Sequence, residues 1–141
     1  MKIGTLLGAV AGGIVTFLLG FLFFGILLAD YFKADMIEYA GLLKDPPMIA
    51  LIFLFNVTFA WLISWALDYG GGSGWAEGAK VGAIVLFVIS LGMFFEFEAF
   101  MNIHKSLAPT LVHLLVVMVM GAAGGAVIGI VQGYFKRERA L

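Results

Sequence analysis

Glycine recurs at every fourth position in the last apolar stretch of the chain, which reads GAAGGAVIGIVQG from residue 121 to residue 133. In an α-helix, residues four apart lie in one row along one face. A row without side chains lets another helix backbone approach closely, and in lipid this close packing is what associates helices. The stretch therefore predicts a membrane helix that packs along its glycine face. The residues of this row are Gly121, Gly125, Gly129 and Gly133.

Small residues with the same spacing occur in the first apolar stretch. They are Gly4, Gly8, Gly12, Thr16 and Gly20. We expect the first and last helices to pack against each other along these two rows, because each row offers the other a groove. Gly78 and Gly82 give the third stretch a shorter row. If the third helix also packs within the chain through this row, one face of small residues has no partner helix and is available to a partner subunit.

The composition indicates that lipid is the solvent of this chain. Apolar residues make up 63% of its 141 residues and charged residues 12%, against about 45–50% and about 25% in soluble domains. Four apolar stretches, at about 3–29, 48–67, 76–100 and 107–135, each reach the length of about 20 residues that a spanning helix needs. None alternates as a lipid-facing barrel strand would. We therefore predict a single all-α domain over residues 1–141, an integral membrane bundle of four transmembrane helices.

Several function classes are disfavoured by what the sequence lacks. The net charge is −1 and no basic stripe is interleaved with aromatic residues, so nucleic acid is not expected as a partner. The absence of cysteine excludes disulfides, thiolate metal sites and a cysteine nucleophile. The glycines from Gly70 to Gly74 lack the order of a phosphate-binding loop and predict a turn.

Ionisable side chains in the apolar stretches are the main candidates for a functional site, because charge is expensive in lipid. Glu96 and Glu98 lie near the end of the third stretch, and His113 lies early in the fourth. The short connection puts them at a similar depth, where Glu96 and His113 would face each other. Such a pair can relay a proton or hold a cation. The alternative is that both carboxylates simply end the apolar span and reach water.

Two further polar residues extend the candidate set. His104 would add a nitrogen ligand, but no motif places two ligands on one helix face, so we expect neither a metal nor a cofactor. Asn56 lies in the middle of the second stretch, where its amide would bond across helices or line a solute path, and we favour the interhelical bond. The dense phenylalanines of the first and third stretches would line a groove for a lipid, quinone or pigment, or serve packing, and we favour packing.

The basic residues suggest an orientation. One side of the bundle collects Lys2, Lys80, Lys136, Arg137 and Arg139, and the other collects Lys33, Lys44 and Lys105. Because Lys and Arg are in excess in cytoplasmic loops, this bias predicts that both termini are cytoplasmic. The first connection, at 30–47, is expected to include a short surface helix at 36–43. Residues 18–23 resemble residues 90–95, which would fit two duplicated helical hairpins.

Three parts of the chain resemble a family of small, uncharacterised four-helix bacterial membrane proteins that is grouped as a domain of unknown function. They are the run GFLFFGILLAD at 20–30, the run GAKVGA at 78–83 and the glycine-rich last stretch. The resemblance covers nearly the whole chain. It implies four spans and an inner-membrane location, and it supplies no activity and no catalytic residue.

Three functions follow as hypotheses. The first is a structural or interaction protein that self-associates or serves as an accessory subunit of a larger membrane complex, because the small rows suit packing and no chemistry converges. The second is a small oligomeric carrier or channel lined by Glu96, His113 and Asn56. The third is a membrane enzyme on lipid or quinone with Glu96 and His113 as acid and base. No activated hydroxyl or triad motif is present, so we expect no enzyme.

Overall fold

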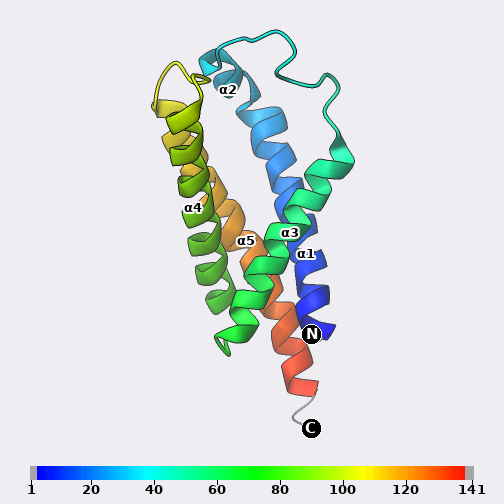
Figure 1. Ribbon diagram of the computed structural model, residues 1–141. Coiled ribbons are helices and arrows are strands. Elements are labelled where there is room, and N and C mark those ends of the chain that lie inside the picture. The colour runs from blue at the N-terminus through cyan, green and yellow to red at the C-terminus, as the bar shows by residue number, and fades with distance from the viewer. Residues whose placement is uncertain (1–2, 139–141) are drawn as a thin grey trace.

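A computed structural model describes residues 3–138, and within this range the chain is helical with connecting loops (Figure 1). The elements in order are α1 (Ile3–Gly20), the π-helical turn η1 (Phe21–Leu27), α2 (Ala29–Asp35), α3 (Ile49–Tyr69), α4 (Trp75–Phe100) and α5 (Ala108–Glu138). Four helical segments are long and apolar enough to cross a membrane, namely Ile3–Leu27, Ile49–Tyr69, Trp75–Phe100 and Ala108–Arg137. The prediction of an all-helical chain with four apolar helices of spanning length is confirmed.

The first helix differs from the expectation of one continuous run. It changes at Phe21 into η1, whose wider turn is closed by the Leu28 N–H donating to the Phe23 carbonyl at 2.8 Å. The short helix of the first connection is α2, which lies earlier than the expected helix at 36–43. Met36 instead forms an antiparallel bridge with His104, so a long-range backbone pairing replaces the helix there. Residues 21–23 are π-helical whereas residues 90–95 are α-helical, so these similar segments differ in conformation.

Helices α4 and α5 approach each other most closely at glycine residues, at one end of the bundle. A Cβ added at Gly78 would overlap the carbonyl of Gly125, and one added at Gly82 would overlap that of Gly121. At the start of α4, the Gly74 N–H donates to the Gly129 carbonyl at 2.9 Å. We call these six residues the glycine seam. Its three pairs are Gly74 with Gly129, Gly78 with Gly125, and Gly82 with Gly121.

The glycine row of α5 thus packs on α4, not on α1 as expected from the two longest rows. Helix α1 lies on a neighbouring face of α5, where a Cβ added at Gly12 would meet Ile128 at 2.5 Å and the Gly124 carbonyl at 3.1 Å. The next residue, Gly13, faces Val57 of α3. The other glycines of the two predicted rows lie beside various residues. Gly4 lies by Phe135, Gly8 by Ser64 and Ile128, Gly20 by Met120, and Gly133 by Gly74.

The two ends of the bundle differ in what connects the helices. Both ends of the chain lie at the same end of the bundle (Figure 1), together with the turn at 70–74, and we call this the terminal end. Gly71 and Gly74 of that turn have φ of 72° and 90°, which favour glycine. Lys136 donates to the carbonyls of Gly71 and Gly72 there. The opposite end, with α2 and the connection at 101–107, is called the loop end.

A buried polar cluster ties α1, α3 and α5 together in the terminal half. The Gln132 side-chain amide donates to the carbonyl and to the hydroxyl of Ser64, both at 2.7 Å. The Ser64 hydroxyl donates in turn to the Thr5 carbonyl at 2.7 Å. Ser64 is fully buried and Gln132 is 3% exposed. Around them lies the apolar core of Ala60, Ile63, Leu67 and Ile128.

Candidate functional site

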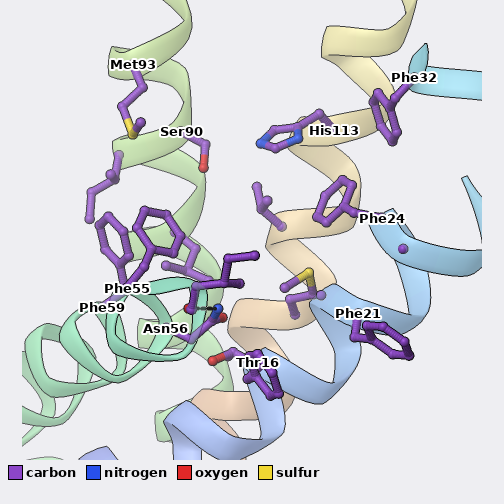
Figure 2. A pocket seen from close by; sticks show the side chains of 18 of the residues that line it. Thr16, Phe21, Phe24, Phe32, Phe55, Asn56, Phe59, Ser90, Met93 and His113 are labelled. Atoms are coloured by element: carbon purple, nitrogen blue, oxygen red, sulfur yellow. Dashed lines mark hydrogen bonds between the residues drawn. The ribbon is translucent and has the colours of Figure 1, made fainter. Parts of the chain in front are cut away.

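A cavity of about 790 Å³ opens among the four long helices in the loop half of the bundle. Its walls come from α1, η1, α3, α4 and α5, and aromatic rings line much of it (Figure 2). The aromatic residues of the lining are Phe17, Phe21, Phe24, Phe32, Phe55, Phe59, Phe94 and Phe97. The volume falls within the range of about 300–1,000 Å³ that is usual for small-molecule sites.

The depth of the cavity matches one leaflet of a bilayer. On α5 the lining runs from Pro109 to Met120, eleven steps along the helix that rise about 16 Å. The hydrocarbon core of a bilayer is about 30 Å thick, so this length is about half of that thickness. The lining residue of α1 that lies nearest the terminal end is Thr16, which lies beside Gly124 of α5.

The cavity opens sideways. Several of its lining residues are also exposed on the outer surface of the helices, including Phe21 on η1, Phe55 on α3, and Met93 and Phe97 on α4. Phe55 keeps 52% of its surface exposed. Because these residues belong to helices of spanning length, the opening faces the zone where lipid would lie.

The loop end above the cavity is held by a set of contacts between two distant connections. The Asp35 carboxylate accepts from the Ser106 hydroxyl at 2.8 Å and lies 3.4 Å from the His104 ring. The Lys105 backbone N–H donates to the Asp35 carbonyl, and the Ile37 N–H donates to the Ile103 carbonyl, each at 3.0 Å. Ile103 and His104 themselves line the cavity. These contacts, which we call the loop clasp, cover its end.

Two of the polar lining residues are satisfied by their own helices. The Asn56 amide donates to the Ile52 carbonyl at 2.8 Å, one turn back in α3. The Thr16 hydroxyl donates to the Gly13 carbonyl at 3.2 Å in α1. Asn56 therefore faces the cavity, but its bond stays within α3 and does not join two helices as we favoured from the sequence. Asn56 and Thr16 thus make this part of the cavity wall polar, and each donates one hydrogen bond within its own helix.

His113 and Ser90 differ from that pair. His113 is half-buried, with its ring 5.0 Å from the ring of Phe24 and 6.2 Å from that of Phe32. Within residues 3–138, neither the His113 ring nitrogens nor the Ser90 hydroxyl makes a hydrogen bond or an ion pair. Figure 2 shows the two side chains pointing toward one another across the cavity from α5 and α4. Thr110, one turn before His113 on α5, also lines the cavity and makes no hydrogen bond among the described residues. Three unpartnered polar side chains thus face one apolar space.

The carboxylates expected at this site lie elsewhere. Glu96 and Glu98 are exposed at the loop end of α4 and do not line the cavity. The structure therefore does not bring Glu96 to His113, and His104 lies beside Asp35 instead. Among the described residues, no group of three or more His, Cys, Asp or Glu side chains could hold a metal ion.

Sequence reasoning missed Ser90 and the loop clasp. Ser90 shares a helix face with Leu86, Phe94 and Phe97, four, four and seven residues away, so a hydroxyl within an aromatic stripe was the available signal. Asp35 reads as an ordinary loop carboxylate, and nothing in its neighbourhood points to residues 104–106. No family model, no curated protein and no solved structure matches this chain.

Proposed function

We propose that this chain is a multi-pass protein of the bacterial inner membrane that binds a membrane-derived amphiphile in the cavity among its four long helices. The observation that carries this proposal is the cavity itself: about 790 Å³, lined mainly by aromatic and aliphatic side chains. In a bilayer, an apolar space of this size that opens sideways is filled by whatever hydrocarbon the membrane supplies.

The charges at the two ends support the orientation with both termini in the cytoplasm. The terminal end carries Lys80, Lys136 and Arg137, and the sequence adds Lys2 and Arg139, which lie outside the described residues. The loop end carries Lys33, Lys44 and Lys105 against six carboxylates. Since Lys and Arg favour the cytoplasmic side, the cavity belongs to the outer leaflet.

The route of entry distinguishes a lipid-like ligand from a water-soluble one. The loop clasp covers the end of the cavity that would face water, whereas the exposed lining residues Phe21 and Phe55 flank the sideways opening. A ligand therefore enters from the outer leaflet. A single acyl or prenyl chain fits this space, because the cavity depth of about 16 Å is close to the thickness of one leaflet's hydrocarbon layer.

The test is to release the protein from membranes in mild detergent and to weigh it by native mass spectrometry. Ile89 lines the cavity and its neighbour Val88 is exposed outside it. We expect wild type and Val88→Trp to retain about one amphiphile per chain, and Ile89→Trp to retain clearly less, because the larger indole projects into the lined space and competes with the ligand there. Equal retention by all three proteins would contradict the proposal.

A second polypeptide is the other conceivable occupant of the opening. A second copy seated in it would be detected in the same experiment as a dimer without bound amphiphile, dispersed by Ile89→Trp and not by Val88→Trp. That result would replace lipid binding with self-association as the function of this face. A carrier based on Glu96 and His113 is not favoured, because Glu96 is exposed outside the cavity.

A further inference from the structure

The register of α4 against α5 aligns one particular pair of side chains inside the cavity. The glycine seam pairs residue 74 with 129, 78 with 125 and 82 with 121. Each pair lies four residues beyond the last, so the two antiparallel helices continue with 86 opposite 117 and 90 opposite 113. Leu86 and Val117 both line the cavity. The next pair is Ser90 with His113.

Ser90 and His113 are therefore placed by the seam and not by a contact with each other. They lie on facing helices, both line the cavity, and neither makes a hydrogen bond within the described residues. A neutral imidazole has one donor and one acceptor nitrogen, and a serine hydroxyl donates one bond and accepts others. Leaving such groups unpaired in an apolar space is unfavourable, so a polar group of the ligand belongs between them.

The charge of that polar group follows from the lining. Within residues 3–138, no Asp, Glu, Lys or Arg lines the cavity. His113 lies five residues inside α5, about 7.5 Å below its first residue by the helical rise. A phosphate or ammonium at that depth would meet no carboxylate and no Lys or Arg, only the imidazoles of His104 and His113, and a charge in hydrocarbon is expensive. The group must be uncharged.

We propose, on the basis of the proposed lipid-binding function, that the ligand is a neutral long-chain alcohol whose hydroxyl sits between Ser90 and His113. A hydroxyl donates to one of these side chains and accepts from the other, whichever nitrogen of His113 carries the proton. The hydrocarbon tail lies among the phenylalanines toward Thr16 and Asn56. A phospholipid with its charged headgroup at this position is excluded.

The experiment measures retention of three tritiated probes that share one saturated tail: 1-octadecanol, octadecane and octadecyl phosphate. Delipidated protein in a nonionic detergent is equilibrated with each probe at the same mole fraction in the micelles. We expect wild type to bind octadecanol about tenfold more tightly than octadecane, the size of one or two hydrogen bonds in an apolar site. Octadecyl phosphate should bind more weakly than octadecanol.

The variants Ser90→Ala and His113→Phe identify the contact. Each should weaken octadecanol binding about five- to tenfold and leave octadecane binding unchanged. The phenyl ring of the second variant preserves the stacking on Phe24. Ser90→Thr, which keeps the hydroxyl, should retain octadecanol, and Ser73→Ala in the exposed turn is the matched serine control.

Two results would overturn this inference and leave the proposed function intact. They are tighter binding of octadecyl phosphate than of octadecanol, and octadecanol binding that neither variant at Ser90 and His113 changes. The proposed function fails in a different way: wild type then retains none of the three probes, or Ile89→Trp retains octadecane as well as wild type does.

Discussion

The terminal half and the loop half of the bundle use the same two helices, α4 and α5, and reach opposite results. In the terminal half the facing residues are the glycines of the seam, and the backbones touch. In the loop half the same register presents Leu86 opposite Val117, and Ser90 opposite His113, beside a cavity of about 790 Å³. Side-chain size along one unbroken register therefore decides where the bundle is dense and where it is open.

The polar residues follow the same division. In the terminal half, Gln132 and Ser64 are buried and bonded to each other across α3 and α5. In the loop half, Ser90 and His113 face the cavity without a protein partner. In the dense half the polar side chains thus bond across helices, although the Gln132 Oε1 is buried without a partner among the described residues, and in the open half they are available for a ligand.

The largest effect is expected from breaking the glycine seam. Gly82→Ala places a methyl group on the Gly121 carbonyl, whereas a Cβ added at Gly92, in the same helix, meets nothing within 4 Å. We expect Gly82→Ala to lower the free energy of unfolding by about 3 kcal/mol, the upper part of the usual range for overpacking. Gly92→Ala should leave it unchanged or raise it slightly. Thermal unfolding in detergent measures both, and equal midpoints would contradict the seam.

The buried polar cluster should give the next largest effect. Gln132→Leu removes two hydrogen bonds to Ser64, and interhelical hydrogen bonds in membrane proteins contribute about 0.6–1.7 kcal/mol each. We therefore expect a loss of about 1–2 kcal/mol in the free energy of unfolding. The control Thr58→Val removes only an exposed bond within α3. A loss as large in Thr58→Val would mean that the stabilisation does not come specifically from the buried polar cluster.

Breaking the loop clasp should change the local opening of the two connections more than the global free energy of unfolding. Asp35→Asn weakens the contacts with His104 and Ser106, and we expect a cost of at most about 1 kcal/mol. The amides of Ile37 and Lys105, which are bonded across the two connections, should exchange with solvent faster by about fivefold or more. Asp30→Asn, exposed in the first turn of α2, is the control. Unchanged exchange at Lys105 would refute the clasp.

The smallest effect on stability is expected at Ser90. Its hydroxyl makes no hydrogen bond in the described residues, so Ser90→Ala should change the free energy of unfolding by less than about 0.5 kcal/mol. This separates a ligand contact from a structural one, since the same variant is expected to weaken octadecanol binding. A loss above about 1 kcal/mol in ligand-free protein would assign Ser90 to the fold instead.

The number and bounds of the long helical spans could be predicted from the sequence, and every end falls within two residues of the expected one. Hydropathy alone is enough to predict these bounds, because an apolar run of this length has no stable environment other than lipid. The change to a π-helical turn at Phe21 within the first span was not predicted. The partner of each small row could not be predicted. Glycine rows on α1 and α4 suit the row of α5 equally well, and the choice depends on which faces the loops allow to meet.

The candidate site was less accessible to sequence reasoning. His113 was singled out, but its expected partner Glu96 lies outside the cavity, since matching depth does not fix which way a helix face turns. The π-helical turn that brings Phe24 to His113 has no sharper signal than Gly25 in an aromatic run. The contact of Asp35 with His104 joins residues far apart in the chain, which local patterns do not record.

The most direct test of the two-halves account is solid-state NMR of deuterated protein in protonated bilayers. It follows magnetisation from lipid-chain protons to side-chain nitrogens. Gln132 is the single glutamine and His113 one of two histidines, so both signals are assignable in one sample. The account predicts strong transfer from the chain protons to the ring nitrogens of His113 and none to the side-chain amide of Gln132. Equal transfer to both, or none to His113, would contradict it.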